Sequence, residues 1–401
     1  MVIIQENRSV DNLFNGFPGA NTVSSGLDSH GKQVTLKAQD LDSEWDVDHT
    51  HHAFSTEYDG GKLDGFDEVR VQNLAGRRYP GKDFAYAYVP QSETTPYWTM
   101  ASQYVLSDNT FQSNNGPSFP AHLFLVAGQS GNVVDNASKT PWGCDAPNDA
   151  RVPLINPDTG QLIKPGVFPC FDQKEISVTL ADELDAAGLS WRYYAPAIGS
   201  DYGQNWSVYD SIKWIRYGND WQNDVISPET QILTDVQNGN LANVTWVVPS
   251  ASNSDHGGID SLNGPSWVAS VVNAVGQSKF WKSTAIFVMW DDWGGWYDHV
   301  APPQYGYEGN GFRIPLIAIS PYALSGVVTH TQHEGAGVLK FIENRFGLAQ
   351  MSSADTRASD LTEMFDFNQQ PRQFQVIPQA VPTERLIRAS QADHRNPDDD
   401  R

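Results

Sequence analysis

The chain has 401 residues, of which 39% are hydrophobic and 11% aromatic, so it can bury a sizeable core and global disorder is excluded. Acidic residues outnumber basic ones 48 to 26, which gives a formal net charge of -22. A surface this negative repels the phosphates of nucleic acids, so nucleic acid is not expected as a substrate or partner. No apolar run reaches the roughly 18 residues that a membrane-spanning helix requires, and no protein partner is implied.

Short apolar runs alternate with helical patterns along the chain, which predicts an α/β fold. The runs are too uniformly apolar for a sheet with one wet face, so we expect a three-layer α/β/α sandwich with a mostly parallel central sheet. The predicted strands are residues 2–4, 190–194, 244–248, 285–290 and 314–319, with a shorter one near 104–106. The predicted helices are residues 96–104, 120–127, 177–187 (capped by Ser177), 265–276 and 337–346.

Three long irregular stretches separate these elements, at residues 20–90, 128–175 and 195–240. Loops of this length are usually functional, so we expect them to form cap insertions in a single domain that spans residues 1–387. The Asp-rich residues 388–401 are expected to form a frayed polar tail.

The two cysteines, Cys144 and Cys170, both lie in an irregular segment rich in Pro, Gly and Asp. A disulfide between them would hold this loop together and indicate an oxidising compartment, whereas two unrelated free thiols are the alternative. The chain opens directly on an apolar run at Met1 without a leader pattern. We expect that an export signal has been removed ahead of it, and that the protein is secreted or periplasmic.

Three predicted strands end in pairs of side chains that can bind a metal or move a proton. These pairs are Glu6-Asn7, Asp255-His256 and Asp291-Asp292. Adjacent carboxylates such as Asp291 and Asp292 repel each other unless a cation neutralises them, so the sequence favours one divalent metal ion at these strand ends. A solvated Asp-Asp turn is the alternative.

Residues 115–120, Asn-Gly-Pro-Ser-Phe-Pro, are typical of the start of a helix, because proline is tolerated in the first helical turn. Ser118 would then lie at a helix N-terminus, where free N–H groups and the helix dipole favour anions. This position suits a serine that attacks phosphorus, although an ordinary N-terminal cap would show the same pattern.

Histidine is a second chemical resource, because its pKa near neutrality allows it to protonate a leaving group or to bind a phosphoryl oxygen. Histidines cluster at residues 49–52, but a zinc tract there is disfavoured because it lacks cysteine partners. The other candidates are His256, His299, His330 and His333, and the sequence leaves open which of the last three act in the site.

These residues fall in motifs that resemble those of the bacterial phosphoesterase family, which contains the phosphatidylcholine-type phospholipases C and acid phosphatase A. The resemblance rests on dispersed motifs that occur in order along residues 2–348. The motifs are residues 6–11 and 115–120, Asp48-His49, residues 254–256 and 290–299, and the helix at 339–348. The stretch at residues 333–337 departs from the Asp-His-Thr-Ser pattern common in phospholipase members.

The resemblance implies an alkaline-phosphatase-like core and roles at the matching positions. The residues that would hold the metal are Glu6, Asn7, Ser118, Asp291 and Asp292. Ser118 would be the nucleophile and would carry the phosphoryl group, and His49 and His256 would assist it. Substrate contacts are expected from Asn115, Trp293 and His299.

Ser118 is closer to the acid-phosphatase pattern, because some family members carry threonine there, so the expected activity is hydrolysis of small phosphate esters. A phospholipase C that cleaves phosphatidylcholine-type phosphodiesters is the alternative. It would need an aromatic box for the quaternary ammonium of the lipid head group, for which the candidates are Trp191, Trp293, Trp296 and Tyr297. A non-catalytic surface-binding protein on the same fold is a third possibility.

Overall fold

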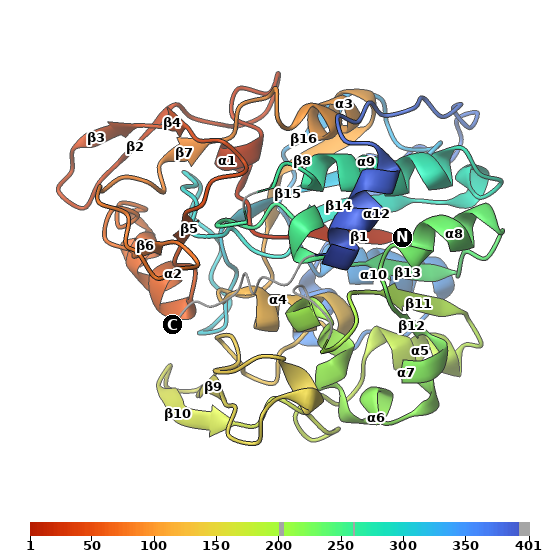
Figure 1. Cartoon of the computed structure of the whole chain (residues 1–401), viewed down its shortest axis with the longest axis horizontal. Helices are drawn as coiled ribbons and strands as arrows, with labels where there is room; N and C mark the ends of the chain where they lie inside the picture. The colour runs from red at the N-terminus through yellow and green to blue at the C-terminus, as the bar shows by residue number, and fades with distance from the viewer. Residues whose placement is uncertain (200–203, 260, 393–401) are drawn as a thin grey trace.

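A computed structural model describes residues 1–199, 204–259 and 261–392 of the chain. A nine-stranded sheet with the order β12-β11-β13-β1-β14-β15-β8-β16 forms its centre, and β17 also pairs with β8 (Figure 1). The strands are β1 (Val2–Gln5), β8 (Val105–Phe111), β11 (Trp191–Tyr194), β12 (Val225–Ile226), β13 (Val244–Val247), β14 (Ile286–Trp290), β15 (Arg313–Ile319), β16 (Val327–Thr329) and β17 (His333–Glu334). Among these described strands only β15 runs antiparallel to its neighbours, so the mostly parallel sheet is confirmed.

Helices cover both faces of the sheet, which explains why β1, β13 and β14 are buried along their whole length. One layer is α3 (Thr95–Gln103), α8 (Gln231–Gln237), α9 (Gly264–Gly276) and α12 (Thr383–Ala392), and α12 crosses in front of β1 and β14 in Figure 1. The other layer is α4 (Ser118–Ala127), α5 (Leu180–Ala186), α10 (Gly337–Phe346) and α11 (Ser353–Arg357). The expected three-layer sandwich is thus confirmed. In the described ranges no helix combines the length and apolar character needed to cross a membrane.

Residues 20–90 are less irregular than the sequence suggested. They form a lobe at the left of Figure 1 from β2 (Ser25–Leu27), β3 (Gln33–Thr35), β4 (Lys37–Ala38), β5 (Asp46–Val47), β6 (Val71–Gln72), β7 (Ala87–Tyr88) and α2 (His51–Tyr58). Strands of two or three residues are too short to show a period, which is why they escaped prediction. The lobe has its own hydrophobic core, in which Phe54, Phe66 and Tyr86 pack against Trp293 and Phe312.

The two other stretches also carry structure. Residues 128–175 contain the hairpin of β9 (Val152–Ile155) and β10 (Leu162–Val167), and a disulfide joins Cys144 to Cys170. The disulfide prediction is therefore confirmed, and the alternative of two free thiols is wrong. Residues 195–240 contribute β12 and α8 to the sandwich. In the described part of the chain the remaining short α-helices are α1 (Val10–Leu13), α6 (Lys213–Arg216) and α7 (Asn219–Asn223).

Most predicted boundaries shift by one or two residues, and three larger differences follow here. Helix α5 is capped by Thr179, not Ser177, because the Thr179 side chain and Asp182 form a reciprocal capping box. Strand β8 extends to residue 111, beyond the predicted 104–106. Its second half was not predicted because it contains polar side chains, which are buried and hydrogen-bonded within the strand, as the Thr110 hydroxyl is to Ser107. The expected tail at 388–401 begins inside α12, and residues 393–401 lie outside the described part of the chain.

Candidate active site

The site forms at the carboxyl ends of the central strands β1, β13 and β14, where the segments that follow these strands come together. β1 and β14 are parallel neighbours in which Gln5 pairs with Trp290, so the residues that follow each strand emerge side by side. β13 flanks β1 on its other side and leads into the loop that carries His256. The carboxyl ends of parallel strands are where ligands bind in such sheets, and the predicted metal and histidine residues gather there.

The five residues expected to hold a metal are buried together. Ser118 Oγ lies 3.2 Å from Glu6 Oε2 and 3.4 Å from Asp292 Oδ2. The Asn7 side-chain amide donates to Ser118 Oγ at 3.3 Å, and the Asn7 backbone N–H donates to Asp291 Oδ1 at 3.2 Å. The structure therefore brings residues from two strand ends and a helix N-terminus into one cluster.

This cluster fits a divalent cation. Its donors are carboxylate and amide oxygens with one hydroxyl, which is the set that hard cations prefer. Asn7 Oδ1 is buried and has no hydrogen-bond partner among the described residues, as expected of an oxygen that serves as a metal ligand. Glu6, Asp291 and His122 each offer a ligand atom, and these atoms lie within 4.8 Å of one another.

The backbone around Asn7 is strained in a way that serves the cluster. Asn7 has φ 62°, a left-handed conformation uncommon for a residue with a side chain. It is held there because Arg8 N–H donates to the Asp292 carbonyl, and because Gly294 packs against it. A Cβ at Gly294, itself at φ 65°, would lie 2.4 Å from the Asn7 carbonyl oxygen, so this position excludes a side chain.

Ser118 is the first residue of α4, and Pro117 occupies the cap position without a side-chain hydrogen bond. The alternative that Ser118 is an ordinary N-terminal cap is therefore wrong. Its hydroxyl instead points at Glu6 and Asp292, and the helix N-terminus behind it favours negative charge.

His49 lies against the cluster. Its Nδ1 donates to the Val47 carbonyl at 2.7 Å, so Nε2 of the neutral ring accepts from the Asn7 side-chain amide at 2.8 Å. The rings of His49 and His256 are 5.7 Å apart. The two predicted catalytic histidines are therefore brought together beside the metal-binding residues.

His256 is held by its own loop. Its Nδ1 donates to the Gly257 carbonyl at 2.6 Å, and its ring stacks on Trp206. Any proton that His256 gives or takes therefore moves through Nε2. The preceding Asp255 is fully buried, and burial raises its pKa to about 6, although the Tyr97 hydroxyl and the Trp290 indole N–H donate to it.

The predicted substrate residues Asn115 and Trp293 have mainly internal partners. Asn115 Oδ1 accepts from His51 Nδ1 at 2.9 Å, and its amide donates to a backbone carbonyl. Trp293 is fully buried, its ring lies nearly perpendicular to that of His49 with the ring centroids 6.3 Å apart, and its indole N–H donates to Glu57 Oε2 at 2.7 Å. Burial holds the pKa of Glu57 well above its ordinary value. Trp293 thus packs against His49 as part of the buried core.

The four aromatic residues considered for a quaternary ammonium box do not form one. Trp191 is 1% exposed and lies in the core of the main sheet. Trp293, Trp296 and Tyr297 are at most 4% exposed and fill the core of the lobe. Their rings are used for packing, so the structure gives no support from these residues for choline recognition.

His299 belongs to a neighbouring ionic cluster. Its Nδ1 lies 2.6 Å from Asp11 Oδ2, and Arg313 forms a bidentate pair with Asp298 at 2.8 and 3.1 Å. Asp11, Asp298 and His299 could in principle bind a metal, but the Arg313 guanidinium, 3.5 Å from Asp11, already supplies positive charge there. The structure therefore places His299 in a buried ion-pair network.

The two remaining histidines also have partners away from Ser118. His330 Nδ1 lies 2.9 Å from Asp108 Oδ1 and is largely exposed. His333 Nε2 lies 3.1 Å from Glu363 Oε1, and burial lowers the pKa of His333.

His122 was not predicted as a site residue; it is buried, with its Nε2 2.9 Å from Glu6 Oε1. The available signal was its spacing, because residues four apart on a helix share a face and His122 follows Ser118 by four positions.

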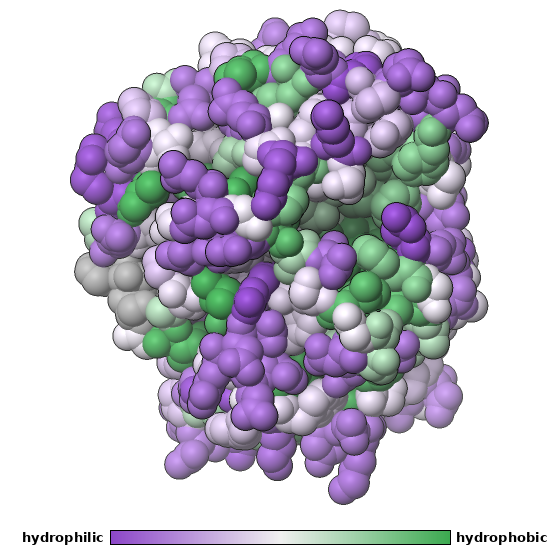
Figure 2. Space-filling view, turned by 90° about the vertical axis from the view of Figure 1, so that its right-hand side faces the viewer, coloured by the Kyte–Doolittle hydropathy of each residue, from purple (hydrophilic) through white to green (hydrophobic). Residues whose placement is uncertain are grey.

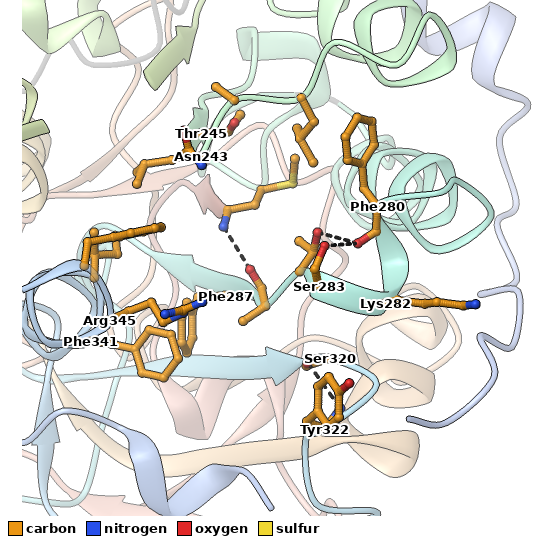
Figure 3. Close-up of a pocket in the computed structure, with 18 of the residues that line it drawn as sticks. Asn243, Thr245, Phe280, Lys282, Ser283, Phe287, Ser320, Tyr322, Phe341 and Arg345 are labelled. Atoms are coloured by element: carbon orange, nitrogen blue, oxygen red, sulfur yellow. Dashed lines mark hydrogen bonds between the residues drawn. The ribbon is translucent and has the colours of Figure 1, made fainter. Parts of the chain in front are cut away.

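A large cavity lies elsewhere, at the amino ends of β1 and β14, on the opposite side of the sheet from the Ser118 cluster. Its volume is about 730 Å³, and it is lined by strand starts such as Met1 and Ala285 and by Phe341 and Arg345 of α10 (Figure 3). Figure 2 shows the face of the molecule on this side, with a hollow bordered by hydrophobic side chains. The cavity shares no lining residue with the Ser118 cluster, so its size does not identify a catalytic site.

Comparison with protein families gives a match to the phosphoesterase family over residues 1–349. The chain is 25% identical to a haemolytic phospholipase C of Pseudomonas aeruginosa, covering 92% of this chain and 55% of that protein. It is 24% identical to phospholipase C A of Mycobacterium tuberculosis, covering 92% of this chain and 77% of that protein. It is 21% identical to non-specific phospholipase C1 of Arabidopsis thaliana, covering 93% and 72%.

Among solved structures, a Vibrio parahaemolyticus protein of the alkaline phosphatase superfamily aligns with a TM-score of 0.39 and 10% identity, covering 67% of this chain and 64% of that chain. The phosphonate monoester hydrolase of Agrobacterium radiobacter aligns with a TM-score of 0.35 and 11% identity, covering 68% and 72%.

Proposed function

The chain belongs to the phosphoesterase family and is a phosphoester hydrolase, and from this premise we propose that it works through a covalent phosphoserine at Ser118 with the help of one divalent cation. The observation that carries the proposal is the position of the Ser118 hydroxyl at a helix N-terminus within hydrogen-bond distance of Glu6, Asn7 and Asp292. A serine with a purely structural role would not need a buried environment of two carboxylates and an amide at a helix N-terminus.

The residues that would hold the cation are Glu6, Asn7, Ser118, Asp291 and Asp292. When bound, the cation would lower the pKa of the serine hydroxyl and stabilise negative charge on the phosphoryl oxygens. The acidic surface of the molecule cannot supply this positive charge, since the net charge is -22.

The reaction has two displacements. In the first, Ser118 Oγ bonds to phosphorus, the bond from phosphorus to the alcohol oxygen breaks, and the alcohol leaves with a proton. In the second, water attacks phosphorus, the bond to Ser118 Oγ breaks, and the serine recovers its proton. The carboxylates of Glu6 and Asp292 orient the hydroxyl for the first step.

The two histidines have distinct roles in this scheme. His49 contacts Asn7 through Nε2; when protonated there, it would donate from Nε2 to a phosphoryl oxygen beside Ser118 in place of accepting from Asn7. His256 has its Nδ1 committed to the Gly257 carbonyl, so it delivers a proton to the leaving oxygen through Nε2.

The substrate class favoured by the relatives is a phospholipase C-type phosphodiester, because the named relatives from two bacteria and a plant are phospholipases C. Hydrolysis of phosphomonoesters is the second candidate, on the ground that residue 118 is serine as in acid phosphatase members. Secretion is proposed on the Cys144–Cys170 disulfide, which requires an oxidising compartment.

Ser118→Ala tests this function. The variant should fold normally and lose several orders of magnitude in kcat, because no neighbouring group replaces a hydroxyl that becomes covalently bonded. Turnover of p-nitrophenyl phosphorylcholine and of p-nitrophenyl phosphate is measured, and rapid quenching with labelled substrate followed by peptide mapping looks for phosphate on Ser118.

The matched control is Ser352→Ala. Ser352 is a true N-terminal cap, of α11, so its loss should cost about 1 kcal/mol of stability and leave turnover unchanged. A folded Ser118→Ala protein with near-normal turnover would rule out the mechanism.

A further inference from the structure

His122 lies directly behind the predicted cation site. It is one helical turn after Ser118 on α4 and is 1% exposed. Its Nε2 is 2.9 Å from Glu6 Oε1, a hydrogen-bond distance, but 3.7 Å from Asp291 Oδ2, which is too long for one.

The two oxygens of the Glu6 carboxylate therefore have different partners. Oε1 faces His122, whereas Oε2 lies 3.2 Å from Ser118 Oγ. A hydrogen bond to one oxygen of a ligating carboxylate fixes the rotation of the group, so the second oxygen stays directed at the metal and the nucleophile.

We propose that His122 is a positioning residue of the cation site, which donates from Nε2 to Glu6 Oε1 and so directs Oε2 toward Ser118 and the cation. The inference rests on the proposed function, since it assigns His122 a role in the site that Ser118 and Glu6 form.

Helix α4 gives this arrangement its rigidity. Residues spaced by four on a helix lie on the same face, so the backbone of α4 fixes the separation of Ser118 and His122. The whole helix is buried, which prevents either side chain from moving independently of the core. One helix thereby carries the nucleophile and the group that orients a metal ligand opposite it.

The test compares His122→Leu with His122→Gln. Leucine fills a similar volume without a donor, whereas the glutamine amide can still donate to Glu6. Binding of Mn²⁺ to chelator-stripped protein is measured by calorimetry, and thermal melting confirms that each variant is folded. We expect a dissociation constant about 10 to 100-fold weaker for His122→Leu, and a much smaller loss for His122→Gln.

Further variants separate this inference from the proposed function. Asp292→Asn should weaken Mn²⁺ binding, and Ser118→Ala should abolish turnover. If both do so while folded His122→Leu binds Mn²⁺ like the unmodified protein, the role of His122 is refuted and the proposed function stands. If Ser118→Ala keeps its turnover, the proposed function fails first.

A direct ligand role for His122 would also overturn the inference. In that case pulsed EPR of bound Mn²⁺ would show the coupling of a coordinated imidazole nitrogen, and His122→Gln would remove it. A positioning role predicts that neither protein shows the coupling of a coordinated imidazole nitrogen.

Discussion

Asn7 shows how much a single residue does in this site. Its backbone N–H binds Asp291, its amide N–H groups bind His49 and Ser118, and its Oδ1 is left for a metal. A left-handed backbone costs of order 1–3 kcal/mol at a residue other than glycine. Here it lets one side chain and one backbone group face the same cluster, so the strain is expected to be functional.

Asp255 gives a pH-dependent prediction. Its pKa is raised by burial to about 6, against about 3.9 in an unfolded chain, so the folded state binds its proton more tightly. Its contribution to stability is therefore full below about pH 4 and is lost as the pH rises to about 6. Asp255→Asn keeps an acceptor oxygen for Tyr97 and Trp290 but cannot ionise.

The stability difference between Asp255→Asn and the unmodified protein should therefore shift in favour of the variant from about pH 4 to about pH 7, by roughly 3 kcal/mol at most. Urea unfolding of both proteins with chelator present, at several pH values in this range, measures the difference. A difference that does not change with pH would show that Asp255 titrates normally in the folded protein.

At the level of elements, the site residues could be predicted because they follow recognisable strands. β1 and β14 are short, uniformly apolar runs, so Glu6-Asn7 and Asp291-Asp292 could be placed at strand ends from the sequence alone. The spacing of four puts His122 on the same face of α4 as Ser118, but spacing alone could not assign it to the site, because its neighbours on α4 are apolar and a lone histidine there is indistinguishable from a core residue. Its role depends on its contact with Glu6, which follows a strand that is distant in the sequence.

The segments that follow β1 and β14 are in close contact at Asn7 and Gly294. Gly294→Ala would place a Cβ 2.4 Å from the Asn7 carbonyl oxygen and 2.8 Å from the Asn7 Cβ. The chain after β14 must then move away from Asn7, which separates the metal-binding residues. We expect a fall of at least about tenfold in kcat/KM and in Mn²⁺ affinity, since small displacements of catalytic groups are costly.

Gly347→Ala is the matched control for the stability lost when alanine replaces a glycine with a left-handed backbone conformation. Gly347 ends α10 at φ 69°, close to the 65° of Gly294, but no atom lies within 4 Å of its added Cβ. Both variants should lose a similar stability of about 1 kcal/mol from the left-handed backbone. If Gly294→Ala loses no more activity than Gly347→Ala, the contact with Asn7 does not hold the site together.

At the level of the whole molecule, the layered core followed from the sequence and the lobe did not. The sandwich was predictable because its strands are long enough to show apolar runs. The lobe at residues 20–90 is held by a second aromatic core in which Phe54 and Tyr86 from the lobe meet Trp293 and Phe312 from far along the chain. Such packing between distant segments leaves no local pattern, and it is why Trp293 was expected at the substrate when it is a core residue.

The net charge of -22 gives a prediction about substrate choice. A field of this sign slows the approach of anions but acts weakly on a zwitterion, and salt screens it as the Debye length falls from about 30 Å at 0.01 M to about 8 Å at 0.15 M. Raising the salt over this range should increase kcat/KM for p-nitrophenyl phosphate, a dianion near neutral pH. The value for zwitterionic p-nitrophenyl phosphorylcholine should hardly change.

Steady-state kinetics on both substrates across this salt range measures the effect, with metal kept saturating so that salt does not act through the cation. The ratio of the two responses matters, because an effect of salt on the fold would alter both values together. A rise for the dianion alone would mean that the molecular field selects against anionic esters and favours a net-neutral phosphodiester. If kcat/KM stays constant for both substrates, the molecular field does not influence their approach, and the net charge then carries no information about substrate.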